Sequence, residues 1–130
     1  MAVDTTLDGV AAELLALLDA RDFDRLRALM TDDAQGVDEI SRGWKRGRDA
    51  IERYFSDALS RVSDIHSTFR DSQSRAWGDV GLVTGVLEQT YKLDGEQQKI
   101  TAPTSLVLVR TDGAWKVALV HSVPLPADEG

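Results

Sequence analysis

The first half of the chain carries apolar residues three and four positions apart, which is the spacing of helices with one buried face. In the first predicted helix this face comprises Leu7, Val10, Ala11, Leu14, Leu15 and Leu18. The second comprises Phe23, Leu26, Leu29 and Met30, and the third, which begins near Arg48, comprises Ile51, Tyr54, Phe55, Ala58, Leu59 and Val62. Thr5 or Thr6, and Asp22, can cap the first two helices, because their side-chain oxygens accept hydrogen bonds from the free amides of the first turn.

The segment between the second and third predicted helices has no clear period. Asp32 and Asp33 indicate the exit from the second helix. Residues 37–40 are predicted to form a short strand, and a loop containing Gly43, Trp44 and Gly47 is predicted to follow it.

From Ile65 onward, β-branched and aromatic residues dominate, and turn-forming pairs interrupt them at regular intervals. The pairs are Gly78-Asp79, Asp94-Gly95 and Asp112-Gly113. Asp-Gly favours the hairpin turns with positive φ that match the twist of paired strands. We therefore predict sequential antiparallel strands at 64–76, 80–93, 97–111 and 114–123.

Two of these strands are apolar at successive positions, 106–109 and 117–120. A sheet with one face in water would alternate apolar and polar residues, so this pattern predicts burial of both faces. The helices can cover one face, and a second copy of the same sheet is the simplest cover for the other. We therefore expect a homodimer.

Composition limits the possible partners. The 130 residues fit one domain, 1–130, and the formal net charge of −7 argues against nucleic acid and anionic membranes as partners. The basic residues Arg42, Lys45, Arg46 and Arg48 are flanked by acids and are interpreted as a solvated loop and helix start. The chain contains no cysteine, no evident signal peptide and no apolar run long enough to cross a membrane, so a cytoplasmic protein is expected.

The order of these elements and three groups of residues resemble one superfamily. The groups are Asp22-Phe23-Asp24 with 29–34, the run 47–51 that reads Gly-Arg-Asp-Ala-Ile, and Trp115-Lys116-Val117 followed by His121, Ser122 and Pro124. They resemble the nuclear transport factor 2-like superfamily, in its SnoaL-like and ketosteroid isomerase-like branch. The resemblance implies an α+β fold: a cone-shaped α+β barrel in which three N-terminal helices pack on a curved antiparallel sheet around an apolar pocket. This fold hosts isomerases, cyclases, dehydratases and pure binding domains, so it does not by itself define a reaction.

Asp38 is the first catalytic candidate. It lies between Val37 and Ile40, where partial desolvation would raise the pKa of its carboxyl group and suit it to act as a general base. The resemblance supports this role, because ketosteroid isomerases have their aspartate base at the matching place. The alternative is an exposed loop aspartate. The other groups of that isomerase do not match: Leu14 stands at the position of its tyrosine, and Ser105 at that of its second acid, so steroid isomerisation is not expected.

His121, Ser105 and Glu88 are further polar candidates. His121 lies among apolar strand residues and could act as acid, base or hydrogen-bond donor, or could be a core or interface histidine. A hydroxyl at Ser105 could donate to a ligand, although less strongly than an acid in an apolar pocket. Glu88 interrupts an apolar strand and is either a pocket carboxylate or the start of the solvated end of that strand.

Three aromatic residues, Trp44, Tyr54 and Trp77, are candidate ligand contacts, with core packing as the alternative. Trp44 is expected at the open end of the pocket, and Tyr54 on the inner face of the third helix. Two histidines far apart in sequence do not make a metal site, no glycine elbow surrounds Ser105, and no glycine-rich phosphate loop follows a strand. No metal or other cofactor is therefore expected.

These observations predict a small-molecule pocket protein of the SnoaL-like type with a small apolar ligand. Its activity would be a cofactor-free proton transfer, isomerisation or cyclisation of an apolar carbonyl compound, with Asp38 as base and His121, Ser105 and Tyr54 as donors or orienting groups. The alternative is a non-catalytic ligand-binding or oligomerisation module like the association domain of calmodulin-dependent kinase. The polar content of the pocket distinguishes them, because an enzyme needs at least two converging titratable groups.

Overall fold

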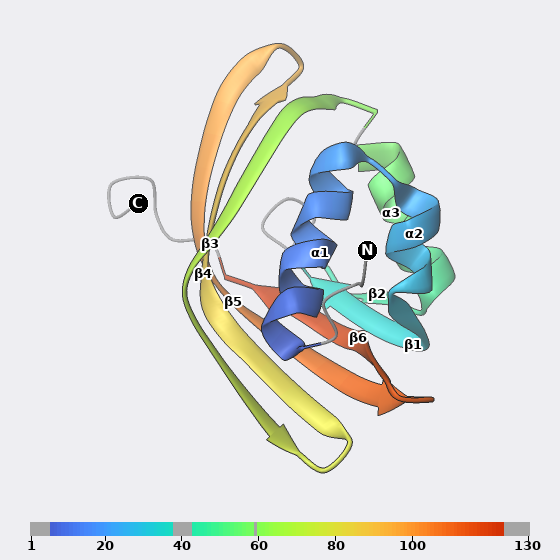
Figure 1. Ribbon diagram of the computed structural model, residues 1–130. Helices are drawn as coiled ribbons and strands as arrows, with labels where there is room; N and C mark the ends of the chain where they lie inside the picture. The colour runs from blue at the N-terminus through green and yellow to red at the C-terminus, as the bar shows by residue number, and fades with distance from the viewer. Residues whose placement is uncertain (1–5, 38–42, 59, 124–130) are drawn as a thin grey trace.

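A computed structural model describes residues 6–37, 43–58 and 60–123 of the chain (Figure 1). Its helices are α1 (Leu7–Ala20), α2 (Phe23–Ala28) and α3 (Arg48–Ala58). Its strands are β1 (Met30–Val37), β2 (Lys45–Arg46), β3 (Val62–Trp77), β4 (Val80–Leu93), β5 (Glu96–Thr111) and β6 (Ala114–Ser122). The predicted α+β class is confirmed. No helix of the described residues is long and apolar enough to cross a membrane.

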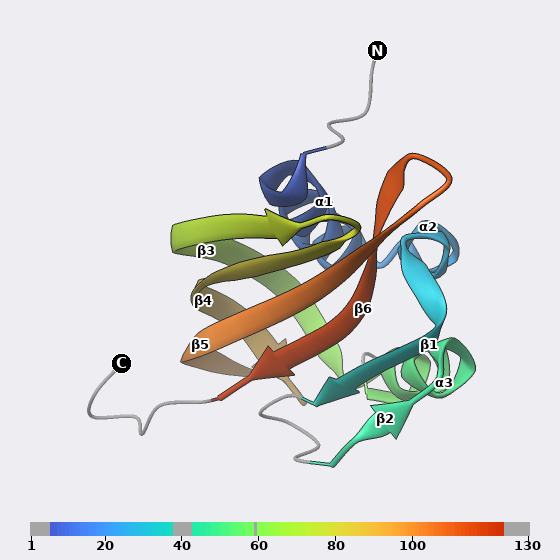
Figure 2. The ribbon, with the colours of Figure 1, turned by 90° about the horizontal axis from the view of Figure 1, so that it is seen from below.

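The strands form one six-stranded sheet in the order β2-β1-β6-β5-β4-β3. All pairs are antiparallel except β1 and β6, which run in the same direction (Figure 2). The prediction of a wholly antiparallel sheet is therefore wrong, because the sheet is mixed. The predicted order of two helices, a short strand, a third helix and four long strands differs from the structure in one element, because two strands, β1 and β2, lie between α2 and α3. The long connection from β1 to β6 gives the chain the length that a parallel pairing requires.

The three hairpins lie where the turn pairs predicted them. In the β4–β5 turn, φ is 52° at Asp94 and 87° at Gly95, and in the β5–β6 turn it is 53° at Asp112 and 80° at Gly113. Two successive positive φ values define the type I′ turn that Asp-Gly favours. These turns fix the register of β4, β5 and β6, and the predicted strand bounds are confirmed to within two residues.

Two irregularities in β3 contribute to the curvature of the sheet. The register of β3 against β4 shifts twice, between Ser63 and His66 and between Arg70 and Gln73. Asp64 and Asp71 lie within these shifts with φ of 52° and 55°. An extra residue in one strand bends that strand and increases its twist, so two bulges curl the long β-sheet around α1 (Figure 1).

The core fills the space between α1 and the concave face of the sheet. The buried residues of α1 are Val10, Ala11, Leu14 and Leu17, and they belong to one apolar cluster with Leu26, Met30, Val83, Leu106, Leu108 and Val117. Leu7 packs over Gly81, where an added Cβ would lie 2.4 Å from the Leu7 side chain. A glycine at this point of β4 therefore lets the start of α1 approach the strand closely.

Residues 30–47 differ most from the prediction. Met30, Asp32 and Asp33 lie on β1 instead of at the end of a helix, and Lys45 and Arg46 form β2 where a loop was predicted. The strand predicted at 37–40 shares only Val37 with β1, and its remaining residues lie outside the described part of the chain. Backbone pairing with β2 on one side and β6 on the other stabilises β1 despite its poor strand composition.

Candidate functional site

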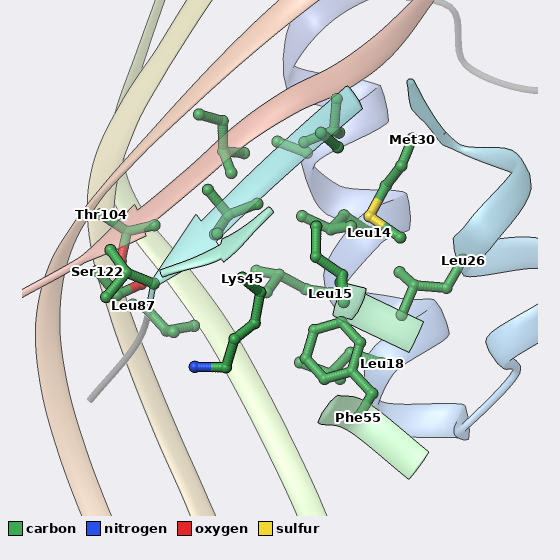
Figure 3. Close-up of a pocket in the computed structure, with 18 of the residues that line it drawn as sticks. Leu14, Leu15, Leu18, Leu26, Met30, Lys45, Phe55, Leu87, Thr104 and Ser122 are labelled. Atoms are coloured by element: carbon green, nitrogen blue, oxygen red, sulfur yellow. The ribbon is translucent and has the colours of Figure 1, made fainter. Parts of the chain in front are cut away.

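A cavity of about 110 Å³ lies between α1, α3 and the concave face of the sheet (Figure 3). Its walls are mainly apolar, and the side chains that Figure 3 places around it include Leu14, Leu15, Leu18, Phe55 and Leu87. An apolar cavity of about 150 Å³ in another protein binds benzene. At about 110 Å³ the pocket of the present protein is somewhat smaller than that cavity, so its size suits at most a small ring compound or a short apolar chain.

The walls follow directly from the local sequence pattern. Ala11, Leu14, Leu15 and Leu18 line the pocket from one side of α1 because of their helical spacing. On β4, the ring of Phe69 lies over Gly85, where an added Cβ would lie 2.7 Å from that ring. Glycine at this position therefore allows the aromatic ring of β3 to lie across its neighbour and close one side of the cavity.

A series of hydrogen bonds leads to Gln89, which lines the pocket and is buried on the concave face of β4. Its amide Nε2 donates to Ser67 Oγ at 3.0 Å. Ser67 Oγ in turn donates to Asp19 Oδ1 at 2.7 Å, and the backbone amide of Ser67 donates to Asp19 Oδ2 at 3.0 Å. Asp19 is at the end of α1, so these hydrogen bonds connect α1 with β3 and β4 and hold the Gln89 side chain in place.

A second polar pair, Thr104 and Ser122, lines the pocket from β5 and β6 (Figure 3). Thr104 Oγ1 donates to the backbone oxygen of Ala102 at 2.9 Å and lies 3.0 Å from Ser122 Oγ. A hydroxyl has one proton, so Ser122 is the donor in the contact between the two hydroxyl groups. Both side chains are buried, and their polar atoms are accommodated without an ionised group.

Lys45 and Tyr54 also belong to the lining, and each carries a hydrogen-bond donor. Lys45 projects from β2 with its Nζ 4.5 Å from the centroid of the Tyr54 ring and 2.7 Å from the backbone oxygen of Gly43 (Figure 3). Tyr54 comes from α3 and packs on Phe55 with ring centroids 5.5 Å apart. A cation over an aromatic ring is attracted to the electron-rich ring face, so this contact holds the ammonium group of Lys45 beside the Tyr54 ring.

Of the residues proposed from sequence, Tyr54 lines the pocket. Asp38, the proposed base, lies outside the described residues. His121 and Ser105 are directly paired across β6 and β5, and each is the sequence neighbour of a pocket residue, Ser122 and Thr104 respectively. Successive strand residues point to opposite faces, so the structure places His121 and Ser105 on the convex face of the sheet and not deep in the pocket.

The other three candidates also lie away from the cavity lining. Trp44 stacks on His121 with ring centroids 6.0 Å apart and an interplanar angle of 15°. Trp77 is 58% exposed at the end of β3. Glu88 faces away from the pocket between Leu87 and Gln89 and accepts a hydrogen bond from Arg70 Nε at 2.6 Å. This bond raises the pKa of Arg70, as expected for an ion pair.

Sequence reasoning missed Gln89, Ser67 and Asp19. The alternation of β4 contains the signal for Gln89: Val83, Leu87, Gln89 and Tyr91 occupy alternate positions and are all buried. A polar residue in the row that faces the helices must satisfy its amide inside the protein. Ser67 and Asp19 show no such signal, because their contact joins residues 48 positions apart in sequence.

The fold and site define a class of protein: an α+β domain whose curved sheet and helices surround a mainly apolar pocket. The chain belongs to the SnoaL-like domain family, whose model matches residues 8–126. Its place in the nuclear transport factor 2-like superfamily, predicted from the sequence, is confirmed. No curated protein matches the sequence.

Several solved structures share the fold. A ketosteroid isomerase-like protein from Erwinia carotovora atroseptica has a TM-score of 0.80 and 17% identity, with 92% of this chain and 94% of that chain covered. A protein of the nuclear transport factor 2-like family from Streptomyces avermitilis, described as a candidate dehydratase, has a TM-score of 0.82 and 18% identity over 91% and 93% of the chains. A candidate calcium/calmodulin dependent protein kinase II association domain from Xanthomonas campestris has a TM-score of 0.81 and 20% identity over 93% and 86%. At these identities the likeness establishes the fold alone.

Proposed function

We propose that this protein binds a small, mainly apolar molecule in the pocket between α1, α3 and the concave face of the sheet. The observation that carries the proposal is the lining itself: an apolar cavity of about 110 Å³ with a few polar groups at defined points. Such a combination is typical of small-molecule sites, in which apolar walls provide affinity and a few polar groups fix orientation. Membership of the SnoaL-like family supports a pocket-type protein.

Proton transfer on a carbonyl compound is the second function, and the Lys45–Tyr54 pair favours it. Abstraction of a proton beside a carbonyl places negative charge on the carbonyl oxygen, and donors directed at that oxygen lower the barrier. Lys45 and Tyr54 both belong to the lining of this pocket, and the Lys45 ammonium group lies 4.5 Å from the centroid of the Tyr54 ring. The base would be Asp38, and its role is a prediction from sequence. We leave His121 and Ser105 out of this proposal, because their positions alternate with those of the pocket residues Ser122 and Thr104.

We also propose that the protein forms a homodimer through the convex face of the sheet. Leu82, Val107 and Leu119 form one cross-strand row on that face, and Val86 lies on the same face of β4, four residues after Leu82. These four half-buried residues, the convex patch, face away from α1. A second sheet packed on them would remove this apolar surface from water, which is the driving force for association.

A pair of tryptophan substitutions on α1 tests the binding proposal. Leu15→Trp puts a larger side chain into the cavity, whereas Ala16→Trp places the same group on the exposed side of the same helix. Toluene binding is measured by titration calorimetry. We expect saturable binding to the unmodified protein and to Ala16→Trp, and at least a tenfold loss in Leu15→Trp. Absence of saturable binding to the unmodified protein, or equal binding by both variants, would contradict the proposal.

A further inference from the structure

The direction of each hydrogen bond around Gln89 follows from the chemistry of its partners. A carboxylate only accepts, so Asp19 takes the single hydroxyl proton of Ser67 at 2.7 Å. Ser67 Oγ then has only lone pairs left for Gln89. The glutamine must therefore turn its Nε2 toward Ser67, at 3.0 Å, and its Oε1 away. Asp19 thus sets the orientation of an amide two hydrogen bonds distant.

The amide oxygen of Gln89 keeps some exposure. No group among the described residues donates a hydrogen bond to Gln89 Oε1. If this oxygen were fully enclosed, it would be a buried polar atom without a partner, and the one such side-chain atom in the described part of the chain is Arg48 Nε. Gln89 Oε1 therefore retains some accessible surface. Gln89 is 7% exposed and lines the pocket, so its free oxygen is available to a molecule in the pocket.

We propose that Gln89 selects ligands that carry a hydrogen-bond donor, such as a hydroxyl or an N–H group, and that Ser67 and Asp19 are positioning residues that hold Gln89 Oε1 toward the ligand. This inference rests on the proposed binding function and names the chemical class of the ligand: a small, mainly apolar alcohol, phenol or amide. A buried acceptor left unpaired costs free energy, so a ligand without a donor at this point is disfavoured.

The Thr104–Ser122 pair also favours a ligand that carries a hydrogen-bond donor. Thr104 gives its proton to the backbone oxygen of Ala102, and Ser122 gives its proton to Thr104, so the lone pairs of Ser122 Oγ are not used by this contact. Ser122 therefore also offers acceptor capacity to the pocket. Gln89 on β4 and Ser122 on β6 consequently both favour a hydrogen-bond donor on the ligand.

Phenol and toluene test the inference, because they have nearly the same shape and differ by one hydroxyl donor. The measured quantity is the ratio of their dissociation constants in each variant, obtained by titration calorimetry. This ratio cancels changes in cavity size or stability that affect both ligands equally. Gln89→Met removes the acceptor and keeps the length of the side chain.

Two further variants separate orientation from simple packing. Ser67→Ala removes the group that orients Gln89, and Ser67→Thr restores a hydroxyl at the same place. Gln35→Met is the control for loss of an amide beside the pocket, because Gln35 also lines the pocket but is exposed and its Oε1 already accepts from Arg46 Nε at 3.2 Å. Selectivity for phenol over toluene is expected to fall about three- to tenfold in Gln89→Met and in Ser67→Ala. It is expected to be unchanged in Gln35→Met and to be recovered in Ser67→Thr.

The outcomes distinguish this inference from the proposed function. If toluene and phenol bind the unmodified protein and the ratio does not change in Gln89→Met, the inference is overturned and the binding function stands. If the ratio falls in Gln89→Met but not in Ser67→Ala, the positioning role of Ser67 and Asp19 is overturned. If neither compound binds the unmodified protein, the proposed function and the inference both fail.

Discussion

The concave and convex faces of strands β4, β5 and β6 are both rich in apolar residues, but they have different surroundings. On the concave face, Val83, Leu106 and Leu108 are at most 3% exposed against the helices, and the polar residues Gln89, Thr104 and Ser122 take part in specific hydrogen bonds. On the convex face, the convex patch is only half-buried, and the charged pair of Glu88 and Arg70 lies in solvent.

The difference shows that hydrophobicity alone does not identify the face of a strand that carries a site. Apolar residues occur on both faces, whereas the buried and hydrogen-bonded side chains of Gln89, Thr104 and Ser122 lie on the face that lines the pocket. Buried polar groups are costly unless they are paired, so their presence beside a cavity indicates a constraint beyond simple packing. The two faces should therefore respond very differently to the same substitution.

Truncation of one valine on each face of β4 should give the largest contrast. Val83 is fully buried and Val80 is 44% exposed, three positions earlier on the same strand. Val83→Ala removes two buried methyl groups and is expected to reduce the free energy of unfolding by about 2–3 kcal/mol. Val80→Ala is expected to change it by less than about 0.5 kcal/mol.

Urea unfolding followed by circular dichroism measures both valine variants at the same protein concentration. Equal destabilisation would mean that the convex face is packed as tightly as the concave face within one chain.

A charge in the convex patch should affect assembly more than folding. Light scattering of the unmodified protein at micromolar concentration is expected to give about twice the chain mass of 14.3 kDa. Leu119→Asp places a carboxylate in the row of Leu82 and Val107, where a second sheet would desolvate it, and a monomer is expected. Circular dichroism should remain native. A monomeric unmodified protein, or a dimer that persists in Leu119→Asp, would refute assembly through this face.

The smallest expected effect lies at the α2–α3 contact, away from both faces. Arg27 hydrogen-bonds Asp49 and Glu52, and the bond from Arg27 holds the pKa of Asp49 below its ordinary value. A lowered pKa contributes stability that is present above the pKa of the unfolded chain and is lost as pH falls through the pKa of the folded chain. Asp49→Asn should therefore lower the urea midpoint slightly at pH 7 and not at pH 2. The same loss at both pH values would exclude the ion pair as its cause.

Strands β3 to β6 could be predicted because their pairing is local. Asp94-Gly95 and Asp112-Gly113 form the expected turns, and each turn aligns two neighbouring strands without information from elsewhere in the chain. Strand β1 could not be predicted in this way. Its parallel partner β6 follows more than 75 residues later, and the pairing of Met30 with Val117 has no local sequence signal.

The candidate site was predicted less well than the fold, for a reason visible in β4. Glu88 interrupts an apolar strand, which makes it either a pocket carboxylate or the start of the solvated end of that strand. It bonds Arg70 on the convex side, whereas its neighbour Gln89 lines the pocket. The same one-residue offset separates His121 from Ser122 and Ser105 from Thr104. In a strand that is apolar on both faces, the sequence shows that successive residues point to opposite faces. It does not show which of the two sets of residues faces the helices. That choice depends on the packing of α1.

Methyl NMR during a toluene titration tests the central claim, that the concave face holds the binding site, most directly. The methyl signals of Leu87, Leu106 and Val120 report on the pocket, and those of Leu82, Val107 and Leu119 report on the opposite face of the same strands. We predict saturable shifts of the first group with one dissociation constant and constant signals in the second. Saturable shifts confined to the convex group, or no saturable shift in either group, would contradict the assignment of the pocket as the functional site.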